Sequence, residues 1–224
     1  MTAVASRTPM SARRLATGWA GVAFFVLFPL GTIFSSNSLE ADDSDKKWQD
    51  WFADSGNRTG NIIGIYALVL ASIAFIVFAS GLLERFRTTE GPSLPHRIAA
   101  TTGTVFAVLT VVGAIQLGGV SGNISFGDTP VPKDADIMRQ TLGYGTLAVG
   151  GALMAAAFMI AVALQARATF PQWLIVLTYV FAVILLGAVF FLPLAALPIW
   201  VLIVSIVVLT RGAPAAVPAA APAV

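Results

Sequence analysis

The chain has 224 residues, of which 57% are hydrophobic and only 11% are charged, against about 25% charged residues in an average soluble domain. A soluble domain of this length cannot bury so much apolar surface, because a small domain leaves too much of its surface exposed. The net charge of +2 and the lack of a Lys/Arg stripe with interleaved aromatic residues exclude nucleic acid as an expected partner. The absence of cysteine excludes disulfides, thiolate metal sites and thiol catalysis.

The charged residues fall in groups that are separated by long apolar runs. Each run approaches or exceeds the ~20 residues that a helix needs to cross a ~30 Å hydrocarbon core, and backbone groups in lipid must be satisfied within the helix. We therefore predict an all-α fold, a polytopic transmembrane helix bundle occupying residues 15–210. Its six expected spans are 15–36, 60–83, 98–120, 141–164, 173–191 and 194–210.

The first run resembles a signal peptide in one respect, because Arg13 and Arg14 precede it. The apolar stretch from Leu15 to Phe34 is, however, longer than the ~7–15 residues of a signal-peptide core, and no A-x-A cleavage site follows it. We predict a retained helix that follows a cytoplasmic segment, residues 1–14.

The loop after the first span has the pattern of a short helix. Trp48, Trp51 and Phe52 are spaced at i, i+3 and i+4, so they share one helical face, and the opposite face is charged. Ser44 is placed to cap the helix N-terminus. We predict a short interfacial helix in this first outer loop, with the three aromatic residues as candidate contacts for lipid or a partner.

The third and fourth spans hold the other candidate contacts. Gln116 is the strongest polar side chain within a span, and we favour an interhelical hydrogen bond over a ligand contact. Ala148, Ala152 and Ala156 form a small-xxx-small ladder on the fourth span. Packing within the bundle is the favoured reading of the ladder, and a docking face for a partner or a second copy is the alternative.

The region from Phe170 to Leu209 is too long for one crossing, since one helix would reach about 60 Å. Pro193 and Pro198 lie near its middle, so we favour a tight hairpin over one overlong kinked helix. Residues 211–224 are mostly Ala, Pro and Val and are expected to form a disordered cytoplasmic tail.

The distribution of basic residues predicts the orientation. With six spans and an inner N-terminus, the inner segments hold eight basic residues and the outer segments hold five, as the positive-inside rule requires. The inner residues are Arg7, Arg13, Arg14, Arg85, Arg87, Arg97, Arg167 and Arg211, and the outer residues are Lys46, Lys47, Arg58, Lys133 and Arg139. We expect a multi-pass protein of the plasma (inner) membrane with both termini in the cytoplasm.

No catalytic motif is found: the sequence has no H-E-x-x-H, G-x-S-x-G or Gly-rich phosphate loop. His96 is the only histidine, so a haem held by two histidines is excluded, and we expect neither cofactor nor metal. No ionisable residue lies deep in an expected span, whereas ion-coupled transporters usually carry one.

Short motifs resemble those of a known family. They are Asp54–Thr59, Gly81–Arg87, Leu142–Tyr144, Phe191–Leu194 and Leu197–Trp200. Together they are similar to uncharacterised multi-pass membrane proteins of actinobacteria, a domain-of-unknown-function family. The resemblance implies a bacterial inner membrane and a compact helical bundle, and it supplies no catalytic residues.

These observations favour a non-enzymatic membrane protein that binds lipid or a partner, as an accessory protein. The expected partners are membrane lipids and another membrane protein or a second copy of this chain. The alternative is a transporter or channel for a neutral or apolar small molecule, whose cavity Gln116 and the threonines would line. A membrane-embedded enzyme that uses interfacial Asp or Glu residues ranks third.

Overall fold

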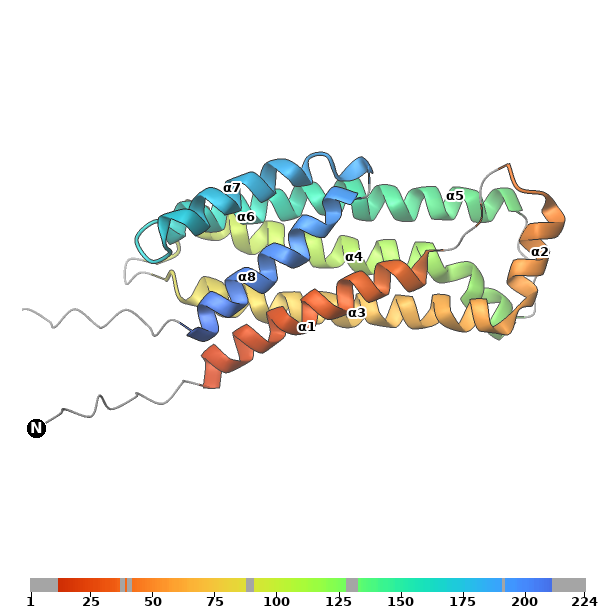
Figure 1. The fold of residues 1–224 in the computed structure, drawn as a ribbon, viewed down its shortest axis with the longest axis horizontal. Coiled ribbons are helices and arrows are strands. Elements are labelled where there is room, and N and C mark those ends of the chain that lie inside the picture. The colour runs from red at the N-terminus through yellow and green to blue at the C-terminus, as the bar shows by residue number, and fades with distance from the viewer. Residues whose placement is uncertain are drawn as a thin grey trace, which may run out of the picture.

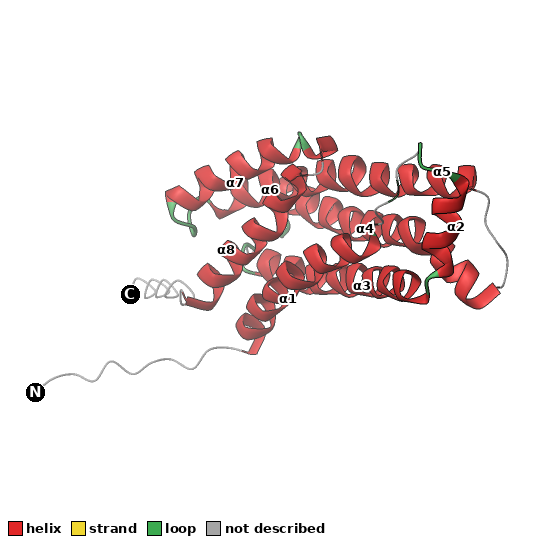
Figure 2. Cartoon of the chain, turned by 45° about the vertical axis from the view of Figure 1, so that its right-hand side comes forward, coloured by secondary structure: helices red, strands yellow, loops and turns green. Residues whose placement is uncertain are grey.

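A computed structural model describes residues 12–36, 39, 42–87, 91–127, 133–190 and 192–210. These residues form helices and connecting turns with no β-strand, so the prediction of an all-α helical bundle is confirmed (Figures 1 and 2). The helices are α1 (Ala12–Ser35), α2 (Asp45–Ala53), α3 (Ser55–Glu84), α4 (Leu94–Gly127), α5 (Lys133–Tyr144), α6 (Ala152–Ala166), α7 (Gln172–Leu185) and α8 (Ala196–Thr210). The predicted tail, 211–224, and most of the predicted segment 1–14 lie outside the described residues.

Among the described residues, five helical segments are long and apolar enough to cross a membrane: Ala12–Ser35, Ser55–Glu84, Leu94–Gly127, Lys133–Ala166 and Pro193–Thr210. The fifth expected span, 173–191, corresponds to α7, which is apolar but has only 14 residues, about 21 Å of helix. Two short 3-10 segments, Ala188–Phe190 and Leu192–Ala195, join α7 to α8. The region 170–210 therefore forms a hairpin of two helices, as Figure 1 shows.

The first and last helices meet at one end of the bundle. Arg14 of α1 donates hydrogen bonds from Nε to the Val208 carbonyl and from Nη2 to the Leu209 carbonyl, both at 2.7 Å. The start of α1 and the end of α8 thus share one end, whereas α2 lies at the other (Figure 1). Following the predicted orientation, we name these the inner end and the outer end.

Aromatic side chains fill the middle of the bundle. Phe75 of α3 lies at the centre of the cluster, with ring centroids of Phe106 at 4.7 Å and of Phe158 at 5.3 Å. The other members of the aromatic cluster are Phe24, Phe28, Phe78 and Trp200. All these rings are at most 2% exposed. The cluster joins α1, α3, α4, α6 and α8.

Glycines let α1 and α3 approach closely. A Cβ atom placed on Gly64 would lie 2.3 Å from the backbone nitrogen of Ser35, and one on Gly81 would lie 1.9 Å from Thr17 Oγ1. No side chain fits at such separations, so hydrogen is the largest substituent these two positions accept without movement. In lipid, where helix association depends on close packing, small residues of this kind hold two helices together.

Three of the described helical segments are longer than the hydrocarbon core requires. The 30 residues of Ser55–Glu84 span about 45 Å, and the 34 residues each of Leu94–Gly127 and Lys133–Ala166 span about 51 Å, against a core of ~30 Å. Counted outward from Arg85, that core ends near Tyr66, which is 67% exposed and at the depth where tyrosine is favoured. About 15 Å of helix therefore extends beyond the core at the outer end.

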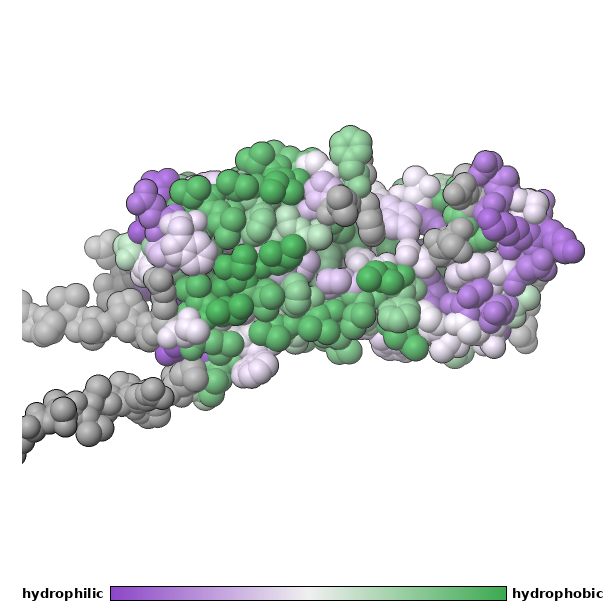
Figure 3. Space-filling view, viewed as in Figure 1, coloured by the Kyte–Doolittle hydropathy of each residue, from purple (hydrophilic) through white to green (hydrophobic). Residues whose placement is uncertain are grey.

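We call this extension, with α2 lying across it, the outer cap. It consists of α2 and of residues 55–64, 118–127 and 133–144. Figure 3 shows hydrophilic residues gathered at this end and at the inner end, with a hydrophobic belt between them. This is the surface pattern of a protein that crosses a membrane.

Candidate functional site: the outer cap

The helix α2 forms where the sequence predicts it. Ser44 caps it, since its side-chain oxygen accepts a hydrogen bond from the Lys47 backbone N–H at 3.3 Å. Trp48 is buried at 4% exposure, while Trp51 and Phe52 are half-buried and their rings meet edge to face at 4.8 Å. The structure thus brings these three predicted contact residues together, with Trp48 turned into the protein.

Two side chains of α3 hold the end of α2. Arg58 donates from Nη1 to the Ala53 carbonyl at 2.9 Å and to the Phe52 carbonyl, and from Nε to Ser125 Oγ at 3.3 Å. Asn57 donates to the Trp51 carbonyl at 3.2 Å. The last carbonyls of a helix lack partners within the helix, so Arg58 satisfies them and ties α2 to both α3 and α4.

We expect the substitution Arg58→Gln to loosen α2 without unfolding the bundle. Hydrogen bonds to a charged group contribute about 1.5–3 kcal/mol each. Because this arginine is partly solvated, we expect the substitution to lower the free energy of local opening of α2 by about 1–2 kcal/mol. Backbone amides of α2 should then exchange hydrogen about tenfold faster, which mass spectrometry of deuterated peptides measures. The control is Lys46→Gln, on the exposed face of the same helix, which should leave the exchange unchanged.

A lysine of α5 attaches the loop before α2. The Lys133 ammonium donates to the Asp43 carbonyl and lies 3.5 Å from a carboxylate oxygen of Asp45. Lys47 also pairs with the Asp43 carboxylate at 2.7 Å. Exposed ion pairs of this kind contribute little stability each, so they set the position of the loop more than they hold the cap together.

Polar side chains are buried inside the cap. Asn61 is 3% exposed and Ser121 is 1% exposed. Asn61 donates to the Ser35 carbonyl at 2.7 Å, whereas Ser121 Oγ is buried without a hydrogen-bond partner among the described residues. Burying a polar group costs free energy unless it is paired, so the Ser121 hydroxyl lowers the stability of the cap, whereas the bond to Ser35 compensates for the burial of the Asn61 amide.

Asp136 is the buried carboxylate of the cap, with 2% of the residue exposed. It accepts a hydrogen bond from Gln140 Nε2 at 2.8 Å. It lies 30 residues before the inner end of α6, about 45 Å along the helix, and is therefore outside the hydrocarbon core. Burial raises the pKa of Asp136 from 3.8 to about 6, although the Gln140 hydrogen bond and the Arg139 charge act to lower it.

The raised pKa of Asp136 predicts a pH-dependent stability. Because the folded-state pKa of this carboxyl lies above its unfolded value, the folded state binds its proton more tightly, and stability falls as pH rises from about 4 to above 6. The difference between 3.8 and about 6 corresponds to about 3 kcal/mol at most. The substitution Asp136→Asn should remove this decline and raise the melting temperature at pH 7.5. Thermal unfolding of both proteins between pH 4 and pH 8 measures the effect, and parallel curves would contradict it.

Gln116 makes the interhelical hydrogen bond favoured by the sequence. Thr146 Oγ1 donates to Gln116 Oε1 at 3.0 Å, joining the helix after α5 to α4. Thr146 belongs to a π-helical segment, Gly145–Gly151, that links α5 to α6. Such segments are rare and frequently occur at functional sites, and no residue pattern in the sequence indicated this one.

The alanine ladder lies inside the bundle. Ala148, Ala152 and Ala156 are 6%, 1% and 2% exposed, and their segment packs against α4, where Gly113 faces Leu147. Their burial leaves almost none of these methyl groups for contact with lipid or another protein. The ladder and Gln116 lie where α4 contacts the π-helical segment and α6, whereas the aromatic residues of α2 lie apart from them at the tip of the cap.

No family model matches the chain, and no curated protein or solved structure shows a significant similarity to it. No functional residue is therefore carried over from another protein, and the resemblance to an actinobacterial family stays a prediction. Within the ranges that the structure describes, no three His, Asp or Glu side chains lie close enough together to hold a metal ion.

Proposed function

We propose that this chain is a non-enzymatic protein of the inner membrane whose helical bundle holds the outer cap in place for a partner protein. Exposed apolar side chains on the cap carry the proposal. Phe126 at the end of α4 is 86% exposed, and Met138 on α5 is 65% exposed. Phe126 lies 29 residues beyond Arg97, about 43 Å along the helix, and is therefore beyond the lipid that covers apolar residues elsewhere on this chain.

Large apolar side chains in water favour association, since contact with a partner removes their surface from solvent. The cap also exposes charged residues: Lys46 and Asp50 on α2, and Arg139 on α5. A few apolar anchors within a polar rim is the usual composition of a protein–protein interface. The cap therefore has the chemistry of a recognition surface.

The alternative function is transport of a neutral small molecule. A transport path along the bundle axis needs a gap between the helices at mid-depth, and the aromatic cluster occupies that depth. Phe75 lies ten residues before Arg85, about 15 Å from the inner boundary and so near the middle of the core. Gln116 is bonded to Thr146 near the outer boundary. These positions favour a structural role for the bundle over transport.

Photo-crosslinking in native membranes tests the partner proposal. A photoreactive amino acid replaces Phe126 or Met138, and the control position is Leu94, which is 71% exposed at the inner end. We expect a discrete protein adduct from the two cap positions and none from Leu94. The double variant Phe126→Ser, Met138→Ser should reduce recovery of the same partner by at least tenfold. Adducts with lipid alone at the cap would overturn the proposal.

The proposed orientation places both termini in the cytoplasm. It is supported by the excess of arginine in the inner segments and by the meeting of α1 and α8 at one end. The chain has no cysteine, so a single introduced cysteine reports its own side of the membrane. We expect Gln49→Cys to react with an impermeant maleimide in intact spheroplasts and Ala168→Cys to react only after lysis; the reverse result would invert the topology.

A further inference from the structure

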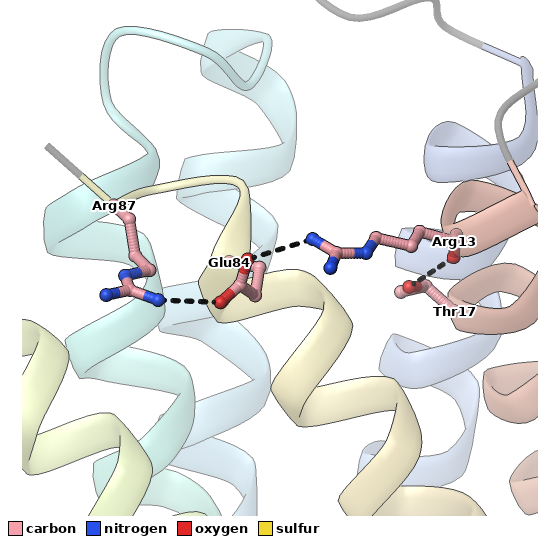
Figure 4. A network of polar contacts seen from close by, with 4 residues as sticks. All are labelled: Arg13, Thr17, Glu84 and Arg87. Atoms are coloured by element: carbon pink, nitrogen blue, oxygen red, sulfur yellow. Dashed lines mark hydrogen bonds and ion pairs between the residues drawn. The ribbon is translucent and has the colours of Figure 1, made fainter.

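The inner ends of α1 and α3 carry a cluster of charges. Thr17 of α1 packs against Gly81 of α3, and one turn further inward Arg13 lies 3.4 Å from Glu84 Oε2. Arg87 donates to the other oxygen, Glu84 Oε1, at 2.9 Å. Figure 4 shows Glu84 between the two arginines. This carboxylate is therefore already shared by two cations.

The next residues along the same two helices are Arg14 and Arg85. The Arg14 guanidinium donates to the carbonyls at the end of α8, which are neutral acceptors. Arg85 is partly buried, and its guanidinium has no hydrogen-bond or ion-pair partner among the described residues. Burial, and next the positive charge of Arg14, lower the pKa of Arg85, but a guanidinium stays charged in proteins. Arg85 is thus a cation that is partly withdrawn from water, lies close to a second cation and has no anion beside it among the described residues.

A charge in this situation is costly unless an anion compensates for it. Of the acids in the inner segments, Glu84 is engaged and Glu90 lies outside the described residues. A second polar group at this end also lacks a partner among the described residues, the buried Nδ1 atom of His96, and His96 is close enough to influence Glu84. The inner end therefore offers a positive site with spare hydrogen-bond capacity.

We propose that Arg85, with Arg14 beside it, binds a phosphate group at the inner end of the bundle, and that this phosphate belongs to the headgroup of an anionic phospholipid. The planar fork of a guanidinium matches two phosphate oxygens at once. Arg85 directly follows α3 at the depth where headgroup phosphates lie on the inner side. A lipid phosphate there would compensate the charge of Arg85.

The test uses the full chain in a neutral detergent and the variants Arg85→Gln and Arg97→Gln. Arg97 is the matched control, since it is an exposed arginine at the same end. The melting temperature is followed while phosphatidylglycerol, phosphatidylcholine or inorganic phosphate is added. Each basic residue near an anionic surface contributes about 1 kcal/mol, so we expect Arg85→Gln to bind phosphatidylglycerol about fivefold more weakly and Arg97→Gln to bind it as the wild type does.

Without added lipid, Arg85→Gln should melt at the same temperature as the wild type or higher, because repulsion from Arg14 is removed. This baseline separates loss of binding from loss of folding. If inorganic phosphate raises the melting temperature as much as phosphatidylglycerol does, the site binds phosphate, but the proposal that the phosphate belongs to a lipid is wrong. Two results would overturn the proposal. In the first, phosphatidylglycerol raises the melting temperatures of Arg85→Gln and the wild type equally; in the second, phosphatidylcholine raises that of the wild type as much as phosphatidylglycerol does.

Discussion

Replacing Phe75 by alanine is expected to lower the free energy of unfolding by about 3 kcal/mol. Phe75 is fully buried, and its ring centroid lies 4.7–6.3 Å from those of Phe24, Phe78, Phe106 and Phe158. In lipid the hydrophobic part of the loss is small, because the unfolded helix also places Phe75 among hydrocarbon chains. The loss comes mainly from the dispersion contacts that the cavity removes.

The neighbouring residue provides the control for this experiment. Ile76 is 45% exposed on the same helix and faces away from the cluster, so Ile76→Ala should change stability by less than about 0.5 kcal/mol. Reversible unfolding in mixed micelles of mild detergent and sodium dodecyl sulfate measures both variants. Equal losses from the two substitutions would show that the aromatic cluster does not hold the helices together.

A methyl group on Gly64 is expected to destabilise the bundle by about 2–3 kcal/mol. The new Cβ would lie 2.3 Å from Ser35 N and 2.7 Å from the carbonyl carbon of Phe34. These are backbone atoms, which cannot rotate away as a side chain can, so α1 and α3 must separate. Alanine is the better helix former by about 1 kcal/mol, which offsets only part of the cost.

One turn away on the same helix, Gly60 makes the matched comparison. Its added Cβ would lie 3.9 Å from Phe34 Cδ1, an ordinary contact, so Gly60→Ala should be neutral or stabilising. The two variants have the same change in composition and helix propensity and differ only in the space available. Thermal unfolding in detergent measures the stability of both variants. If Gly60→Ala is also destabilised, the close approach at Gly64 is not the cause of the destabilisation of Gly64→Ala.

The membrane class and the position of α2 were predictable because their signals are local. Apolar runs of about 20 residues indicate spans directly, and the spacing of Trp48, Trp51 and Phe52 after Ser44 predicts a capped helix within ten residues of sequence. The separation of 170–210 into two helices followed from its length and from Pro193. The Gln116–Thr146 bond agrees with the general use of amides between helices in lipid, although the partner itself was not predictable.

The extensions of α3 and α4 past the hydrocarbon were not predicted, because helices outside lipid carry no apolar run to mark them. Residues 121–127 contain glycines and belong to a segment expected to be a loop, yet they continue α4. Asp134 and Asp136 lie in the first turn of α5. The burial of Asp136 depends on contacts between helices, which the order of residues along one helix does not reveal.

The closure of α1 against α8 has a consequence for how the protein is made. Arg14 and Val208 are 194 residues apart in the chain, and a ribosome adds about 5–20 residues per second. For about 10–40 s the newly inserted first helix is therefore without the neighbour that covers Gly18 and Gly21, where Leu209 and Ser205 later pack. During biogenesis that small-residue face is open to lipids, insertion factors or another nascent chain, and only the arrival of the final helix ends this exposure.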